Sequence, residues 1–183
     1  MAGIVVLLSG SGSNLAAIME NELPVKFVMS NNSKAYGIDR ANKKKIPSFV
    51  QSDLKILELH VTKLCLSNDI DLIVLAGFMK LLSPAFVAAW KGKIINIHPS
   101  LLPSFPGARA IEQAFEYGVK YTGVTVHYVD EGMDTGQIIA QEPIKIAKND
   151  TIKNLYGKIH KVEHKLYPKV IKNLLKWKLI KAY

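Results

Sequence analysis

Short apolar runs recur along the first half of the chain, and they predict strands of a sheet. Residues 3–9, 25–31 and 71–77 are almost continuously apolar, as are 47–50 and 93–98 over shorter lengths. Continuous runs of this kind are typical of parallel strands that are covered on both faces, whereas strands with one wet face alternate apolar and polar residues. The pattern therefore favours a sheet buried between two layers.

Between these runs, apolar residues return at spacings of three and four, which predicts helices. The clearest case lies between residues 53 and 67, and others begin near Asn14 and Pro84. The last such segment starts at Ile152 and predicts a long helix. Alternating strands and helices predict an open, Rossmann-like α/β sheet.

The second half of the chain changes its period. Residues 122–129 alternate in a period of two, and residues 136–146 read as a neighbouring strand or hairpin partner. The predicted fold is therefore an α/β single domain over residues 1–183, with a mostly parallel sheet and antiparallel strands late in the chain. We find no repeat, low-complexity tract or interdomain linker.

Composition narrows the classes of protein. The chain has 183 residues, no apolar run long enough to predict a membrane span, and one cysteine, Cys65, so an internal disulfide is excluded. The first residues lead straight into a predicted strand and lack a basic segment, which argues against a signal peptide and for the cytoplasm. The net charge of +9 comes largely from lysines between Lys145 and Lys181. A solvated helix face explains them better than nucleic-acid binding, although such a charge also attracts small anions.

A glycine-rich turn, Ser9–Asn14, joins the first predicted strand to the first helix. Glycines allow a tight turn, and a helix N-terminus offers free N–H groups and a partial positive charge, so the turn predicts a phosphate site. Gly10 and Gly12 match the start of a dinucleotide fingerprint, but Leu15 stands at the third glycine position. A phosphate monoester therefore fits better than a dinucleotide. The alternative is an ordinary turn capped by Ser13 or Asn14.

Asn96 and His98 are the strongest candidates for catalysis. Residues two apart on a strand point to the same side, so both side chains project together where the predicted strand ends. That end of a parallel sheet is where ligands bind. An amide can donate to a developing oxyanion, and an imidazolium can donate or act as an acid. The prolines that follow, from Pro99 to Pro106, disfavour helix and stiffen the segment.

A carboxylate is needed to keep a histidine protonated near neutral pH. Asp130, Glu131 and Asp134 lie in a glycine-punctuated loop between the late strands, and spacing alone does not choose among them. His127 is interpreted as structural, and His60 and His160 as helix-surface residues. Neither a metal-binding histidine pair nor a cysteine pair occurs at the usual spacing, so no metal is predicted.

Five motifs occur in order along nearly the whole chain: LLSGSGSNL, VLAGFMKLLSP, INIHPSLLPSFPGA, GVTVHYVDEGMDTGQIIAQ and EHKLYP. Together they resemble the phosphoribosylglycinamide formyltransferases, the folate-dependent glycinamide ribonucleotide transformylases of purine synthesis. The resemblance implies the formyltransferase fold, with phosphate binding in the N-terminal part and folate binding and catalysis in the C-terminal part. It also implies a formyl transfer from 10-formyltetrahydrofolate to glycinamide ribonucleotide, without metal, nucleic acid or membrane, by a cytoplasmic monomer or homodimer.

The resemblance assigns roles to individual residues. The catalytic residues it implies are Asn96, His98 and Asp134. The substrate-binding residues are Gly12, Ser13, Asn14 and Glu163, and the folate-binding residues are Met79, Lys80, Leu81, Leu82 and Asn96.

Two departures and three rivals qualify the resemblance. Arg109 stands where many relatives have histidine, and an arginine that some members use near folate has no counterpart among residues 52–55. The methionyl-tRNA formyltransferases and the formyltetrahydrofolate deformylases share parts of the motifs, but each is expected to carry a further domain. A basic module that binds anions or nucleic acid is the rival of another class; the lysines suit it, but no aromatic stacking platform does.

Overall fold

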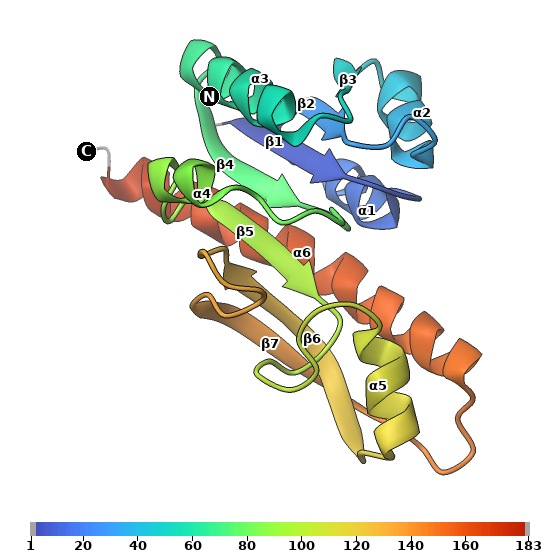
Figure 1. The fold of residues 1–183 in the computed structure, drawn as a ribbon. Coiled ribbons are helices and arrows are strands. Elements are labelled where there is room, and N and C mark those ends of the chain that lie inside the picture. Colours follow the sequence, from blue (N-terminus) through green and yellow to red (C-terminus); the bar gives the residue numbers. More distant parts are fainter. Residues whose placement is uncertain (1–2, 182–183) are drawn as a thin grey trace.

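A seven-stranded sheet forms the centre of the molecule (Figure 1). The computed structural model describes residues 3–181, with side chains described for 3–176. The strands are β1 (Gly3–Leu8), β2 (Val25–Ser30), β3 (Ser48–Val50), β4 (Ile70–Leu75), β5 (Ile94–His98), β6 (Tyr121–Tyr128) and β7 (Ile138–Lys145). Their order is β3-β2-β1-β4-β5-β6-β7, parallel from β3 to β5 and antiparallel from β5 to β7. The predicted mostly parallel sheet with late antiparallel strands is confirmed.

Within residues 3–181, six helices connect or cover the strands. They are α1 (Ser13–Glu20), α2 (Tyr36–Lys43), α3 (Leu54–Ser67), α4 (Pro84–Ala89), α5 (Ala110–Tyr117) and α6 (Ile152–Lys181). The sequence pattern did not predict α2 and α5, because the residues that they bury are mostly small: Gly37 and Ala41 on α2, and Ala110, Ile111 and Ala114 on α5. The non-helical stretch expected after His98 ends where α5 begins.

Alternate residues of the strands enter two separate cores. Ile4, Val6 and Leu8 of β1 face α1, α2 and the long helix α6, whereas Val5 and Leu7 face α3 and α4. All five of these side chains are fully buried. Both faces of the central strands are thus covered, which explains why their sequences are continuously apolar.

Helix α6 crosses behind the sheet and holds its two halves together (Figure 1). Its inner side contributes Leu155, Ile159 and Ile171 to the core, while its lysines face solvent, including Lys161 and Lys165. The exposed lysines agree with the interpretation of a solvated face; the side chains of the last lysines lie outside the described residues. Over the described part of the chain, no helix is apolar and long enough to cross a membrane.

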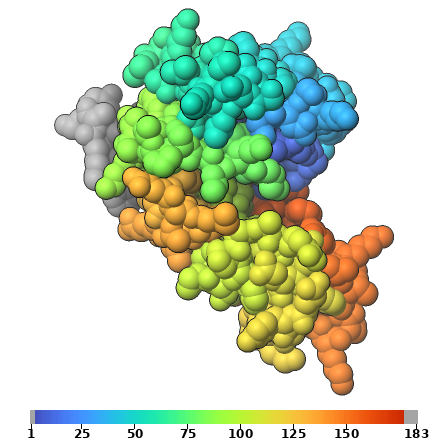
Figure 2. Space-filling model, viewed as in Figure 1, coloured from blue at the N-terminus to red at the C-terminus, as the bar shows by residue number. Residues whose placement is uncertain are grey.

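Tyr167 is the main polar contact between α6 and the sheet. Its ring is fully buried, and its hydroxyl donates to the carbonyl oxygens of Leu75 (2.8 Å) and Ile95 (3.2 Å). Those two carbonyls belong to β4 and β5, so a single hydroxyl fixes α6 against both strands. In space-filling view the surface narrows where the half built on β1–β4 meets the half built on β6 and β7 (Figure 2).

Candidate active site

The carboxyl end of β5 carries the first two predicted catalytic residues. Ile95 and Ile97 point into the core beneath α6, so Asn96 and His98 point to the opposite face. The strand pairs with β4 on one side and β6 on the other, which fixes this orientation. The predicted projection of Asn96 and His98 to one side of the sheet is confirmed.

Asp134 is the acid that reaches them. Its Oδ2 lies 3.3 Å from His98 Nδ1, and its Oδ1 accepts from Asn96 Nδ2 at 3.4 Å. By contrast, Asp130 turns back to its own loop, where it accepts from the Gly132 N–H. Geometry therefore chooses Asp134 among the three acids that the sequence left open.

Asp134 is held in place by its backbone neighbours as well as by side chains. The Gly107 N–H donates to Oδ2 at 2.7 Å, and Asp134 itself has a φ of 56° in the left-handed region. Burial raises the pKa of Asp134, but the hydrogen bond with His127, the Gly107 N–H and the charges of His98 and His127 outweigh it. The net pKa lies below that of an ordinary aspartate, so the group is a carboxylate at neutral pH.

Both ring nitrogens of His98 face hydrogen-bond acceptors. The side chain is buried, Nδ1 faces the Asp134 carboxylate, and Nε2 lies 2.8 Å from the Phe105 carbonyl oxygen. Both neighbours are acceptors, and only the doubly protonated ring can donate to both. In that form, the Nε2–H becomes available once another acceptor replaces the Phe105 carbonyl.

His127 is part of the same cluster, although the sequence interpretation gave it a structural role. It stands directly opposite Asn96 in the antiparallel pairing of β5 and β6. Its Nδ1 donates to the Tyr128 carbonyl at 2.8 Å, so Nε2 faces Asn96 Nδ2 at 3.2 Å and Asp134 Oδ1 at 3.5 Å. The period of two in residues 122–129 gave its face, but the sequence does not contain the register that places it beside Asn96.

The segment after His98 is fixed from β6. The buried hydroxyl of Thr125 donates to the Ser100 carbonyl at 2.7 Å and accepts from the Leu102 N–H at 3.1 Å. Gln141 Nε2 donates to the Leu102 carbonyl at 2.9 Å. These bonds hold the proline-containing wall in the position from which Phe105 and Gly107 contact His98 and Asp134.

At the other end of the edge, the glycine-rich turn leads into α1. Gly12 is the N-cap, with a φ of 68°, and no side chain caps the helix, so capping by Ser13 or Asn14 is absent here. A Cβ on Gly12 would lie 2.6 Å from the Gly37 Cα, so the turn also needs glycine for close packing. The first N–H groups of α1 are free to bind an anion.

Glu163 meets this turn from α6, at a distance of 149 residues along the chain. Its buried carboxylate accepts from Asn14 Nδ2 at 3.4 Å, and His160 Nδ1 lies 2.9 Å from the same oxygen. The hydrogen bond with Glu163 raises the pKa of His160, with the charge of Glu163 adding to it and desolvation opposing it. Asn14 Oδ1 is buried without a hydrogen-bond partner among the described residues, which leaves an acceptor at the start of α1.

The predicted folate-binding residues follow β4 as an extended segment. Met79, Lys80 and Leu81 are exposed, with Met79 79% and Leu81 62% accessible, while Leu82 packs against the core formed with α3 and α4. Exposed apolar side chains beside a polar cluster suit a flat apolar ligand. Arg109, where many relatives are expected to have histidine, is exposed, and its guanidinium lies 3.5 Å from Glu116 Oε1.

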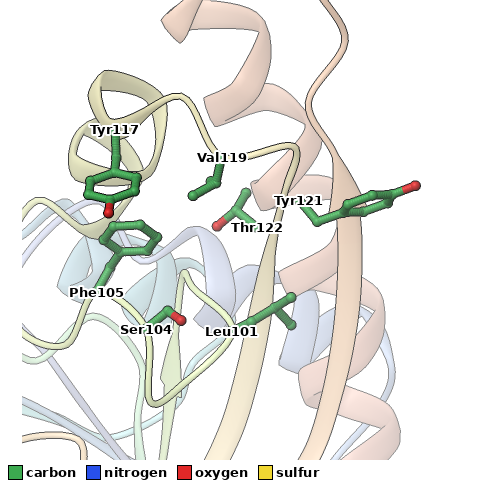
Figure 3. A pocket seen from close by; sticks show the side chains of 7 residues that line it. All are labelled: Leu101, Ser104, Phe105, Tyr117, Val119, Tyr121 and Thr122. Carbon is green, nitrogen blue, oxygen red and sulfur yellow. The ribbon is translucent and has the colours of Figure 1, made fainter.

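Two cavities lie against the wall after β5. One, of about 230 Å³, is lined by Asp134 together with Leu102, Pro103, Pro106, Met133, Thr135, Gly136 and Ile138. The larger, of about 370 Å³, is lined by Leu101, Ser104, Phe105, Tyr117, Val119, Tyr121 and Thr122 (Figure 3). None of Asn96, His98 and Asp134 lines the larger cavity, so we give it no role in the chemistry.

Cys65 lies apart from the cluster, on the buried side of α3. Burial raises the pKa of its thiol to about 12, so it is no nucleophile. Within the described residues, no three His, Cys, Asp or Glu side chains are arranged to hold a metal ion.

Comparisons with known proteins show the family of the chain. The formyl transferase family model matches residues 2–171. The chain is 45% identical to the phosphoribosylglycinamide formyltransferase of Bacillus subtilis (strain 168), over 96% of this chain and 95% of that protein. It is 42% identical to the human trifunctional purine biosynthetic protein adenosine-3, over 91% of this chain but only 18% of that longer protein.

Solved structures give the same result. The phosphoribosylglycinamide formyltransferase of Streptococcus pneumoniae TIGR4 superposes with a TM-score of 0.90 at 41% identity, over 96% of this chain and 99% of that one. Glycinamide ribonucleotide transformylase 1 of Geobacillus kaustophilus gives 0.89 at 44% identity, over the same shares. Sequence, fold and the clustered Asn, His and Asp thus lead to one conclusion: the chain belongs to the phosphoribosylglycinamide formyltransferase family.

Proposed function

We propose that this chain transfers the formyl group of 10-formyltetrahydrofolate to the amine of glycinamide ribonucleotide, in the de novo synthesis of purines. The products are formylglycinamide ribonucleotide and tetrahydrofolate. The observation that carries the proposal is the contact of His98 with Asp134 beside Asn96, at the carboxyl end of β5.

The nucleotide substrate binds at the start of α1. Its phosphate takes the N–H groups of Gly12, Ser13 and Asn14, because a helix N-terminus combines free donors with a partial positive charge. Glu163, which contacts Asn14, lies where it can accept hydrogen bonds from the glycinamide part. Since Asn14 is already tied to Glu163, phosphate and glycinamide are recognised by adjoining groups.

The donor is a formyl-tetrahydrofolate, as in the rest of the family. We place it along Met79, Lys80, Leu81 and Leu82, with Asn96 between the two ligands. The exposed apolar side chains of that segment offer a surface for the pterin ring. This arrangement brings the formyl carbon to the polar face of β5.

The reaction then needs no covalent enzyme intermediate. The amine nitrogen attacks the formyl carbon, the carbonyl bond opens, and the oxyanion of the tetrahedral intermediate takes hydrogen bonds from the Asn96 amide and the His98 Nε2–H. The formyl oxygen replaces the Phe105 carbonyl as the acceptor for Nε2. Asp134 keeps His98 charged and oriented. As the intermediate collapses, the proton lost by the amine is passed to the folate nitrogen, and the bond from that nitrogen to carbon breaks.

Known magnitudes allow this division of work. One oxyanion donor contributes about 10² to 10³ in turnover, and an acid or base about 10² to 10⁴. Holding two reactants in register supplies roughly 7–11 kcal/mol of the barrier. Positioning by the two ligand sites therefore supplies the larger part, and Asn96, His98 and Asp134 supply the rest.

The test is an assay of the purified protein with glycinamide ribonucleotide and 10-formyltetrahydrofolate, in which each ligand is omitted in turn. We expect formylated nucleotide and tetrahydrofolate in equal amounts only when both ligands are present. Release of formate without the nucleotide would instead identify a deformylase. A failure to form formylated nucleotide with both ligands present would disprove the proposal.

A further inference from the structure

Ser9 lies at the point of the sheet where the strand order reverses. It directly follows β1, whose neighbours are β2 on one side and β4 on the other. In open α/β sheets this is the crevice in which ligands bind. The turn that follows Ser9 and the segment that follows β4 are the two segments to which the proposed function assigns the nucleotide and the folate.

The side chain of Ser9 joins these two segments. Its hydroxyl donates to Asn31 Oδ1 at 2.5 Å and accepts from the Met79 N–H at 2.8 Å. Its backbone N–H donates to the Gly77 carbonyl at 3.0 Å, and its carbonyl accepts from Asn32 Nδ2 at 2.9 Å. Ser9 is only 8% exposed, so these bonds are shielded from water.

The segment after β4 has a second anchor at its far end. The buried carboxylate of Glu58 on α3 accepts from the Ser83 N–H at 2.7 Å and from the Ser83 hydroxyl at 2.6 Å. The segment after β4, Met79 to Ser83, which we call the folate segment, is therefore fixed at both ends. Ser83 bonds to Glu58 on α3, and Met79 bonds to Ser9 at the start of the glycine-rich turn. Of these two anchors, the one at Met79 is bonded directly to Ser9, the residue that leads into the glycine-rich turn before α1.

We propose that Ser9 is a positioning residue that couples the two ligands, so that binding of the nucleotide raises the affinity for folate and the reverse. The inference rests on the proposed function for the identity of the ligands. Phosphate bound to the turn holds Ser9 in place, and Ser9 then presents a fixed hydroxyl to Met79. Folate bound along the segment has the same effect in the other direction, because coupling between two sites is reciprocal.

The experiment measures this coupling without any turnover. Tetrahydrofolate carries no formyl group, so its dissociation constant can be measured by calorimetry with and without saturating glycinamide ribonucleotide. In the wild type we expect the nucleotide to tighten folate binding by about tenfold, within the usual range of allosteric coupling. In Ser9→Ala we expect less than about twofold, with the KM values raised and kcat changed little, since Asn96, His98 and Asp134 are untouched.

Two further variants separate coupling from general damage. Asn31→Ala removes the acceptor that orients the Ser9 hydroxyl, and we expect an intermediate loss of coupling. Ser48→Ala is the matched control: the Ser48 hydroxyl donates to Asn42 Oδ1 at 2.8 Å, a bond of the same kind as that from Ser9 to Asn31, but among the described contacts none joins Ser48 to Ser9 or to the segment after β4. Its coupling should equal that of the wild type.

The outcomes are distinct. Absence of coupling in the wild type, full coupling in Ser9→Ala, or an equal loss in Ser48→Ala would each overturn the role of Ser9. If the wild type forms no formylated nucleotide, the proposed function fails instead, and that assay is independent of the binding measurements.

Discussion

Two regions along the carboxyl edge of the sheet, the start of α1 and the end of β5, are built in different ways. At the start of α1, the anion site consists of backbone: the Gly12 turn and the first N–H groups of the helix. At the end of β5, the reactive site consists of side chains: Asn96, His98 and Asp134, held in place by β6 and by the segment after His98. In the proposed function, the turn after β1 therefore supplies a binding surface, whereas β5 and the loop that carries Asp134 supply the chemistry.

The difference predicts which substitutions each end tolerates. A backbone site survives many changes of side chain but not a change that moves the backbone. A side-chain site depends on individual functional groups. Removing one of them lowers turnover but costs little stability, because the backbone stays in place. Mutations at the two ends should therefore separate loss of turnover from loss of folding.

The largest effect should come from His98→Ala. The variant loses one oxyanion donor and the acid, so we expect kcat to fall by about 10³ to 10⁴, or roughly 4–5.5 kcal/mol of transition-state stabilisation. Steady-state kinetics measure this, and circular dichroism checks the fold. His60→Ala is the control, because His60 is an exposed histidine on α3. Near-normal turnover in His98→Ala would contradict the claim that side chains at the end of β5 carry out the chemistry.

Gly12→Ala should instead reduce stability. The new Cβ would lie 2.6 Å from the Gly37 Cα, in a backbone conformation that residues other than glycine disfavour. We expect a loss of about 2–4 kcal/mol, and a melting temperature lower by about 5–15 °C.

Gly10→Ala provides the matched control for stability, since nothing lies within 4 Å of a Cβ at that position. In Gly12→Ala, the KM for the nucleotide should rise far more than kcat falls, because the reactive residues remain in place. A Gly12→Ala protein as stable as Gly10→Ala would contradict the backbone account of the site.

The same distinction explains what the sequence could predict. Periodicity predicted the strands and the long helix, because a strand covered on both faces must be continuously apolar. It also predicted that Asn96 and His98 share a face, which follows from the period of two. Helices α2 and α5 gave no such signal, since the residues that they bury are mostly glycine and alanine.

Contacts between distant segments could not be predicted in that way. Nothing in the spacing distinguishes Asp134 from Asp130, and the register that sets His127 opposite Asn96 is a property of the folded sheet. The proximity of Glu163 and Asn14 likewise requires α6 to cross behind the sheet. Resemblance to a family pointed to Asp134 and Glu163, but gave no contact for His127.

A smaller effect should follow from Tyr167→Phe, which tests whether the two ends depend on one frame. The substitution removes the hydroxyl that bonds to Leu75 and Ile95 and leaves the ring in place. We expect a loss of about 1–3 kcal/mol in the free energy of unfolding, measured by urea denaturation. The exposed Tyr117 provides the control, Tyr117→Phe, with no measurable change. If Tyr167→Phe unfolds like the wild type, then the Tyr167 hydroxyl does not help to hold α6 against β4 and β5.

The smallest effect is a difference in pH response between the two ends. The pKa of His160 is raised by Glu163, so their pairing stabilises the fold fully below pH 6.5 and is lost as the pH rises through the higher folded value. His160 is half exposed, so solvent screening limits this contribution to less than about 1 kcal/mol.

The pKa of Asp134 is lowered, so its contribution to stability is lost only in acid, as the pH falls below the ordinary aspartate range. Thermal unfolding from pH 6 to 9 should therefore show a slope that His160→Gln reduces and His60→Gln leaves unchanged. An unchanged slope in His160→Gln would mean that the pairing of His160 with Glu163 does not make the stability depend on pH in this range.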